Sequence, residues 1–186
     1  MIISLSGKPG SGKSTVAKRL AKVLGYQRYY IGGMRRQAAK EQGMTLAEFN
    51  KLGEQSDETD KVFDEYVAKL GREQDNFVIE SRTAFHFIPH SLKIFLDVTP
   101  QEGAQRIWQG LQQEQSSRNE APNLESYAAV LASVHDRIRS DKTRYQKYYN
   151  LDIFDPGHYD LFLDTTPLDK EQEYEAVYSF VQQKIK

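Results

Sequence analysis

Cysteine is absent from this sequence of 186 residues. Its absence excludes disulfide bonds, thiolate metal sites and cysteine nucleophiles, and it fits a reducing cytoplasm, where we expect the protein to act. Long apolar runs are also missing. No segment has the length of a membrane span, and the first residues run into a glycine-rich turn instead of forming a signal peptide. The sequence therefore predicts a protein that has no membrane partner.

An excess of charge of either sign is missing too, because 25 basic residues stand against 26 acidic ones. A net charge of −1 gives no overall field that could hold a nucleic acid, so the binding of anions must be local. What the chain does have is 39% hydrophobic residues, enough for one sizeable core. We expect residues 1–186 to form a single domain that acts as a monomer.

Short apolar runs alternate with segments of helical spacing. The first run, residues 2–5, precedes a stretch in which Val16, Leu20 and Val23 recur at helical intervals. Further strands are expected at residues 76–80, 92–97 and 159–164, and helices at residues 12–24, 34–42, 46–55, 58–70, 100–113, 124–149 and 169–186. Strands that alternate with helices predict an α/β fold with a parallel sheet covered on both faces, in which ligands bind at the carboxyl ends of the strands.

The turn after the first predicted strand carries a phosphate-binding pattern. Residues 7–14 match G-x-x-x-x-G-K-[ST] at every fixed position, between a predicted strand and a predicted helix. In this pattern backbone N–H groups point at phosphate oxygens, Lys13 reaches the β and γ phosphates, and the Ser14 hydroxyl binds magnesium. We expect ATP with Mg²⁺ to bind at Gly7, Lys8, Pro9, Gly10, Ser11, Gly12, Lys13, Ser14 and Thr15. A loop that binds the nucleotide without turning it over remains an alternative.

Arginines follow other predicted strands, at positions where an open α/β sheet binds ligands. Arg35 and Arg36 come after residues 29–33, and Arg82 comes after residues 76–81. Clustered guanidinium groups repel one another unless an anion lies between them, and arginine suits phosphate because its planar fork can donate two hydrogen bonds. The pattern therefore indicates a small acceptor that itself carries a phosphate group.

Three charged residues, Arg137, Asp141 and Arg144, share one face of a predicted helix. Their spacing alone leaves two interpretations open, a solvated face with an internal ion pair or a part of the site, and the same holds for Arg106. Phosphoryl transfer commonly uses an arginine to neutralise charge on the transferred group.

Two carboxylates, Glu80 and Asp97, end predicted strands, where they can hold magnesium directly or through water. Glu80 is the better candidate because it adjoins Arg82, so we expect the metal at Ser14 and Glu80. The four histidines lack the spacing of metal ligands. Tyrosine and phenylalanine are frequent, but aromatic residues in alternating runs are more often core, and none is assigned to a nucleotide base.

These segments together resemble the nucleoside monophosphate kinases, and most of all the archaeal-type cytidylate kinases. The resemblance spans nearly the whole chain in order: GKPGSGKS at 7–14, IGGMRR at 31–36, GMTLAEF at 43–49, VIESR at 78–82, RI at 106–107, RY at 144–145 and NLD at 150–152. The phosphate loop alone is typical of a superfamily, whereas the ordered set points to this family.

The resemblance implies a P-loop kinase fold, a three-layer α/β/α sandwich with a five-stranded parallel sheet. It also implies a helical acceptor-binding region at residues 33–72 and a lid at residues 110–123. Acceptor binding is expected from Arg36, Arg82, Arg137 and Asp141. A catalytic role is expected for Lys13, Arg106, Arg137 and Arg144.

The activity that the resemblance implies is transfer of a phosphoryl group from ATP to CMP or dCMP. Two departures fall on the acceptor side. Gly110 stands where the family has a second lid arginine, so that either Arg118 substitutes or transfer is weakened, and Ser81 stands where glycine usually precedes the arginine of the third strand. The alternatives are a P-loop kinase for another small acceptor, such as a sugar acid or a nucleoside, and a nucleotide-binding regulatory module without turnover. A switch GTPase is disfavoured, because the NKLG of residues 50–53 lacks the final aspartate of a guanine-reading motif.

Overall fold

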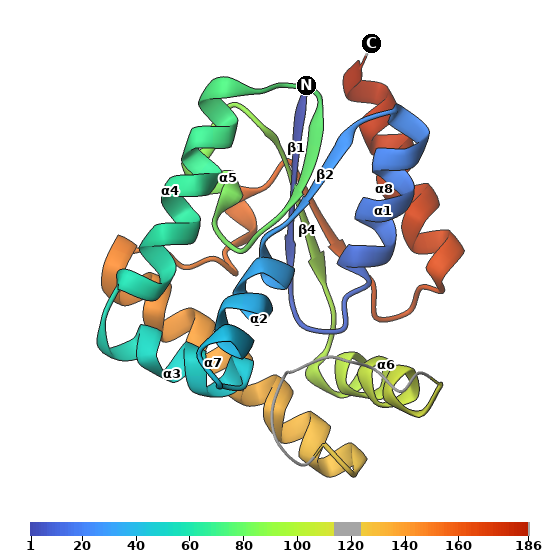
Figure 1. The fold of residues 1–186 in the computed structure, drawn as a ribbon. Coiled ribbons are helices and arrows are strands. Elements are labelled where there is room, and N and C mark those ends of the chain that lie inside the picture. Colours follow the sequence, from blue (N-terminus) through green and yellow to red (C-terminus); the bar gives the residue numbers. More distant parts are fainter. Residues whose placement is uncertain (114–123, 186) are drawn as a thin grey trace.

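The computed structural model describes residues 1–113 and 124–185. Within these residues, five parallel strands form one sheet in the order β2-β3-β1-β4-β5 (Figure 1). The strands are β1 (Ile2–Gly7), β2 (Gln27–Tyr30), β3 (Phe77–Glu80), β4 (Leu92–Asp97) and β5 (Leu161–Asp164). The α/β class and the five-stranded parallel sheet are confirmed.

Helices cover both faces of the sheet and its carboxyl end (Figure 1). One face packs against α1 (Lys13–Leu24) and α8 (Lys170–Ile185), and the other packs against α4 (Glu58–Glu73) and the short α5 (Ala84–Phe87). The remaining helices, which gather toward the carboxyl ends of the strands, are α2 (Ile31–Glu41), α3 (Leu46–Gln55), α6 (Pro100–Gln113) and α7 (Tyr127–Tyr149). A 3₁₀ turn, η1 (Pro156–His158), precedes β5.

The central strand β1 shows why helices must pack on both faces of the sheet. All six of its residues are buried, and successive side chains point to opposite faces. Ile2 joins the cluster that includes Val67 of α4, whereas Ile3 and Leu5 join the cluster that includes Val16 of α1. An apolar run without polar alternation is therefore buried on both sides, as in other parallel sheets.

The order of the strands creates the crevice in which a ligand can bind. β1 lies between β3 and β4, so the chain leaves β1 toward one side of the sheet and later returns to the other side. Leu5 of β1 is in register with Glu80 of β3, and Gly7 is in register with Leu96 of β4. The loops that follow these strands consequently meet at one edge, which is where open α/β sheets bind ligands.

Most of the expected helices and strands are present, with shifts at their ends. The helix expected to begin near residue 34 begins at Ile31, and the one expected from residue 124 begins at Tyr127, where the hydroxyl of Ser126 accepts a hydrogen bond from the N–H of Ala129. The cap expected at Thr45 forms a full capping box with Glu48. Residues 114–123, which include Arg118 and most of the expected lid, lie outside the described residues. Across the described part of the chain, no helix is both long and apolar enough to cross a membrane.

Candidate active site

The loop between β1 and α1 depends on glycine at specific positions. Gly10 and Gly12 have φ angles of 80° and 81°, a left-handed conformation that glycine adopts without strain. A Cβ atom on Gly10 would lie 2.3 Å from the backbone oxygen of Gly103 in α6, so this loop packs directly on α6. α1 then begins at Lys13 and directs the positive end of its dipole toward the loop. The sequence thus builds a phosphate cradle of the expected kind.

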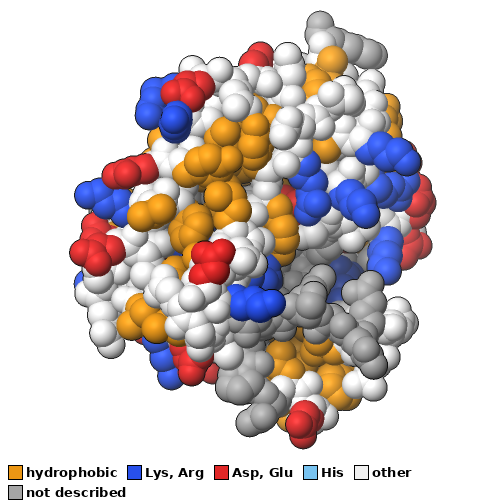
Figure 2. Space-filling model, viewed as in Figure 1, with side chains coloured by type: hydrophobic (Ala, Val, Ile, Leu, Met, Phe, Trp, Pro, Cys, Tyr) orange, Lys and Arg blue, Asp and Glu red, His pale blue; other side chains and the backbone are white. Residues whose placement is uncertain are grey.

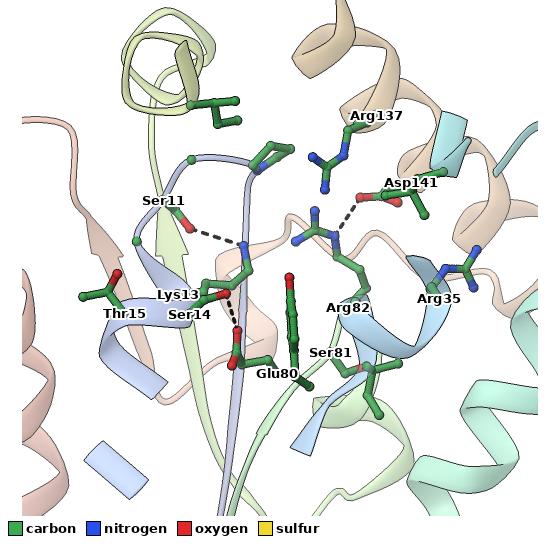
Figure 3. Close-up of a pocket in the computed structure, with 18 of the residues that line it drawn as sticks. Ser11, Lys13, Ser14, Thr15, Arg35, Glu80, Ser81, Arg82, Arg137 and Asp141 are labelled. Carbon is green, nitrogen blue, oxygen red and sulfur yellow. Dashed lines mark hydrogen bonds and ion pairs between the residues drawn. The ribbon is translucent and has the colours of Figure 1, made fainter. Parts of the chain in front are cut away.

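The side chain of Lys13 folds back onto the phosphate loop and contacts its residues (Figure 3). Its Nζ donates hydrogen bonds to the carbonyl oxygens of Gly7 at 2.7 Å and Lys8 at 2.9 Å, and to Ser11 Oγ at 3.4 Å. Desolvation lowers the pKa of Lys13 well below its usual value, and the positive charges of Arg82 and Arg137 lower it further against the opposing effects of Glu80 and Asp141. An anion bound between these cations would restore the charged form of Lys13.

Ser14 and Glu80 form a pair of oxygen ligands beside the loop. The Ser14 hydroxyl donates a hydrogen bond of 2.7 Å to Oε2 of Glu80 (Figure 3). Oε1 of Glu80 accepts a hydrogen bond of 2.6 Å from Arg28. A hydroxyl and one carboxylate suit Mg²⁺, which keeps several waters and takes its other ligands from phosphates. In residues 1–113 and 124–185 there is no cluster of three acidic or histidine side chains that could hold a metal without such help. Asp97, the weaker candidate, is paired with Lys8 instead, at 2.6 Å.

Three cations converge on one cavity, which has a volume of about 680 Å³. Lys13 reaches it from the loop, Arg82 from the end of β3, and Arg137 from α7 (Figure 3). On the face shown in Figure 2, Lys and Arg side chains lie around a central hollow. Arg82 is fixed by an ion pair between its Nε and Oδ2 of Asp141, 2.7 Å apart, and by a hydrogen bond to the carbonyl oxygen of Gly7. Positive charge is thus concentrated beside the phosphate cradle.

Behind this cluster lies a buried network of alternating charges. Arg144 is 1% exposed and donates to Asp60 at 2.6 Å and to Asp141 at 2.6 Å, while Arg35 pairs with the same Asp60 at 2.6 Å. Burial alone would raise the pKa of Asp141, but Arg82, Arg144 and Arg137 hold it below its usual value. Asp141 therefore stays ionised and orients Arg82, with Arg144 as its second partner.

Arg36 of α2 and Arg106 of α6 line the same cavity. Arg36 donates to the Tyr30 hydroxyl at 2.6 Å and to the carbonyl oxygen of Gly32 at 3.1 Å. Arg106 binds the loop after β5, donating to the carbonyl oxygens of Thr165 at 2.7 Å and Leu168 at 3.0 Å. Gly110, one turn further along α6, also lines the cavity, and among residues 1–113 and 124–185 a Cβ atom there would meet no atom within 4 Å.

All of the predicted site residues except Gly7 and Lys8 line one cavity, and further groups join them that the sequence did not reveal. The additions are Arg28, Asn50, Asp60, Asp64 and Glu173, of which Arg28 holds Glu80 and the others line the cavity. Each meets its partner across a large sequence separation, so no local pattern marks it. One signal was visible in the sequence. Asp60 and Asp64 have the same helical spacing as the apolar residues Phe63 and Val67, so they lie on the buried face of α4, where acidic residues are rare.

Comparison with known proteins identifies the family. A sequence model of the cytidylate kinase-like family matches residues 2–167. The chain belongs to the cytidylate kinase-like family. The cytidylate kinase of Methanocella arvoryzae is 37% identical over 169 residues, which cover 91% of this chain and 90% of that protein. The cytidylate kinase of Archaeoglobus fulgidus is 31% identical over 185 residues, covering 99% and 96%. The predicted resemblance is confirmed.

Solved structures agree with the kinase fold of this family. An uncharacterized protein from Eubacterium ventriosum superposes with a TM-score of 0.69 at 17% identity, covering 98% of each chain. Shikimate kinase from Bacteroides thetaiotaomicron gives a TM-score of 0.62 at 15% identity, covering 98% of this chain and 97% of that one. At such identities these likenesses show the fold alone, and the sequence relatives carry the argument on activity.

Proposed function

We propose that this member of the cytidylate kinase-like family transfers the γ-phosphoryl group of ATP to a nucleoside monophosphate, with CMP or dCMP as the acceptor. The proposal is supported by the relatives named cytidylate kinase, which align with nine-tenths of the chain or more. The single observation that carries it in the structure is the convergence of Lys13, Arg82 and Arg137 on one cavity beside the phosphate loop. A kinase for two phosphate-bearing substrates needs such a cluster, because it must bring two anions into line.

The donor is assigned to the loop of residues 7–15, where the backbone N–H groups and Lys13 would hold the triphosphate. Ser14 and Glu80 would hold Mg²⁺, which would supply positive charge to neutralise the phosphates of the bound nucleotide. Arg106 is assigned to the donor side for two reasons. It follows Gly103, the residue of α6 on which the phosphate loop packs, by one helical turn, and it donates a hydrogen bond to the segment after β5. The protein's own contribution is to position the donor and to exclude water, since water would otherwise accept the phosphoryl group.

The acceptor is assigned to the other side of the cluster. Arg36, Arg82 and Arg137 would bind its phosphate, with Asp141 orienting Arg82 through their ion pair. Arg144 touches Asp141 and Asp60, so its proposed part is to hold these carboxylates in place beside the transferred group. We assign the acceptor region to residues 33–72 of a single domain that acts as a monomer. A lid at residues 110–123 stays an expectation, because residues 114–123 lie outside the described part of the chain.

A coupled assay of ADP formation, run with ATP, Mg²⁺ and a panel of nucleoside monophosphates, tests the proposal. We expect turnover with CMP and dCMP. A flat response to every monophosphate would remove the assignment. Turnover with a sugar acid or a nucleoside, and none with a monophosphate, would establish a P-loop kinase of another kind. Saturable ATP binding without transfer to any acceptor would establish a regulatory module.

A further inference from the structure

One oxygen of Glu80, the carboxylate assigned to Mg²⁺, is already occupied by another side chain. Nε of Arg28 donates a hydrogen bond of 2.6 Å to Oε1 of Glu80, and Nη2 of Arg28 lies 2.5 Å from the same oxygen. The hydroxyl of Ser14 donates instead to Oε2 (Figure 3). A carboxylate oxygen has about two lone pairs, so the two nitrogens of Arg28 use those of Oε1. Oε2 is left to face a ligand in the cavity.

The sheet explains why Arg28 meets Glu80. Tyr30 of β2 is in register with Glu80 of β3. Arg28 precedes Tyr30 by two residues, so both side chains point to the same face of the sheet as Glu80. The guanidinium carbon of Arg28 also lies 5.2 Å from the centre of the Tyr30 ring, a distance at which the ring attracts a cation. Arg28 is therefore held by an ion pair on one side and by an aromatic ring on the other.

Arg28 acts on Glu80 from behind the cavity. Within the described part of the chain, Ser14 and Glu80 belong to the residues that line the cavity, and Arg28 does not. The side chain of Glu80 is 3% exposed, so it cannot turn freely into solvent. Arg28 is not placed to touch a nucleotide at the phosphate loop. Its effect on a bound metal must therefore pass through the orientation of Glu80.

We propose that Arg28 is a positioning residue that restricts Glu80 to a single metal-facing oxygen and thereby makes the site select Mg²⁺ over the larger Ca²⁺. This inference rests on the proposed function, which assigns the metal to Ser14 and Glu80. Mg²⁺ demands octahedral geometry and keeps several waters, so one carboxylate oxygen suits it. Ca²⁺ takes more oxygen ligands at longer distances and often binds both oxygens of one carboxylate. An arginine that occupies Oε1 withholds the second oxygen from Ca²⁺.

Binding of ATP in the presence of either metal tests the inference without relying on turnover. Calorimetric titration without an acceptor gives the Kd for ATP with saturating Mg²⁺ and with saturating Ca²⁺, and the ratio of the two Kd values measures the preference for Mg²⁺. Both cations carry the same charge, so loss of the arginine's charge changes the two Kd values alike and cancels in the ratio. In Arg28→Met, where Glu80 can offer both oxygens, the preference should fall about 10-fold, the lower end of the effect of removing a group that orients a metal ligand.

Two further variants separate positioning from a merely structural role. Arg28→Lys keeps a charge and a donor for Oε1 but lacks the planar fork, so it should restore part of the preference for Mg²⁺. Arg19→Met is the matched control, because Arg19 of α1 donates two hydrogen bonds to Glu171 of α8, and neither is among the described residues that line the cavity. It should keep the wild-type preference. A merely structural role of Arg28 would weaken ATP binding with both metals and leave the ratio unchanged.

The outcomes separate this inference from the proposed function. A folded Arg28→Met protein that prefers Mg²⁺ as strongly as the wild type overturns the inference and leaves the kinase assignment intact. An equal shift in Arg19→Met, or a wild type that binds ATP equally well with either metal, does the same. If Arg28→Met does not fold, Arg28→Gln decides, because it loses the charge and one of the two contacts and should shift the preference by a smaller factor. A flat response to every monophosphate, together with a preference that depends on Arg28, would remove the kinase assignment and keep the inference. No binding of ATP with either metal by the wild type removes both.

Discussion

At the scale of single residues, the candidate site is a balance between three cations and the carboxylates that orient them. Lys13, Arg82 and Arg137 face one cavity, and Asp141 is the partner that fixes Arg82. Desolvation, and after it the positive charges of Arg82 and Arg137, lower the pKa of Lys13. We therefore expect this site to bind the anionic phosphates of its substrates. We also expect variants of the residues that contact phosphate to behave differently from variants of the residues that orient those contacts.

Lys13→Ala should reduce phosphoryl transfer by about 10³-fold, the size of effect seen when one preorganised electrostatic group is lost at a reacting centre. Lys13 donates hydrogen bonds to the carbonyl oxygens of Gly7 and Lys8, so its loss removes a positive charge from the loop itself. Turnover at saturating ATP and acceptor measures the effect. Lys18→Ala, which removes an exposed lysine from the same helix, is the control and should keep full activity. Normal turnover by Lys13→Ala would contradict the assignment of the loop.

Arg82→Ala should mainly impair use of the acceptor. Its guanidinium group faces the cavity from the end of β3, whereas the donor phosphates are assigned to the loop. We expect KM for the monophosphate to rise about 10- to 100-fold, as for the loss of a hydrogen bond to a charged group, with little change in KM for ATP. Arg82→Lys should rescue only part of the loss, because lysine lacks the planar fork. Wild-type kinetics for the alanine variant would refute this placement.

Glu173→Gln should change how stability depends on pH. Burial raises the pKa of Glu173 to about 7, against the lowering effects of Arg106 and Lys13, whereas the unfolded chain titrates near 4.5. Between these values the folded state holds a proton that the unfolded state has lost, so wild-type stability falls as pH rises toward 7, by up to about 3 kcal/mol.

Thermal unfolding of the wild type and of Glu173→Gln between pH 5 and 8 measures this effect. The variant should gain stability relative to the wild type across that range, and the gain should level off above pH 7. Glu175→Gln, at an exposed position of the same helix, should follow the wild-type curve. Parallel curves for wild type and Glu173→Gln would show that Glu173 titrates normally.

At the scale of elements, the phosphate loop and its neighbours show how closely α1, α6 and α8 are fitted. Gly10 abuts the backbone of Gly103 in α6, and a Cβ atom on Gly12 would lie 2.0 Å from Oε1 of Glu173 in α8. The conformation of the loop is therefore fixed from two sides by helices that come much later in the sequence.

Gly12→Ala should abolish ATP binding. Its φ of 81° is unfavourable for alanine by about 1–2 kcal/mol, and the new methyl group would collide with the carboxylate of Glu173. Calorimetric titration with ATP and Mg²⁺ measures the loss. Gly110→Ala is the matched control, because its Cβ would meet no atom within 4 Å; it should bind ATP normally and gain about 0.5–1 kcal/mol in stability. Unchanged affinity in Gly12→Ala would show that the loop does not need this conformation.

The sequence predicted the elements best where one physical signal was strong. The examples are the continuous apolar runs that became β1 and β4, the glycine pattern of the loop, and the cap at Thr45. In each of them the residues that carry the signal are close to one another in sequence, so local rules suffice. The start of α2 was wrong because Gly32 and Gly33 suggested a turn. Both are helical here, and the Tyr30 ring packs so close to Gly33 that a Cβ atom would lie 2.6 Å from it. The glycine at this position therefore makes room for the Tyr30 ring and does not end the helix.

The candidate site was predictable only in part for the same reason. Lys13 and Ser14 lie within a motif, and Arg82 follows a strand that ends at the crevice. The partners of these residues come from other elements, as when Arg28 of β2 meets Glu80 across 52 positions and Arg144 meets Asp60 across 84. Such pairs follow from the order of the strands and the packing of α4 against α7, which a single sequence does not specify.

At the scale of the whole molecule, the two proposed phosphate sites share one cavity that is lined by both halves of the chain. The donor loop lies between β1 and α1, whereas the groups assigned to the acceptor come from α2, the end of β3, and α7. A ligand in either site ties together elements that are distant in sequence, so each substrate should stabilise the entire domain against unfolding by mass action.

ATP with Mg²⁺ at 100 times its Kd should stabilise the protein by about 2.7 kcal/mol, which raises Tm by roughly 5–10 °C in a domain of this size. The monophosphate acceptor, added alone, should give a separate increase. The two sites use different cations. In Lys13→Ala, ATP should therefore no longer raise Tm, whereas the acceptor still should. In Arg82→Ala, the acceptor should no longer raise Tm, whereas ATP still should. Thermal unfolding of both variants with each ligand measures these four responses. Loss of both responses in a single variant would mean that the two nucleotides share one phosphate site, and the division of the cavity into donor and acceptor sides would then be wrong.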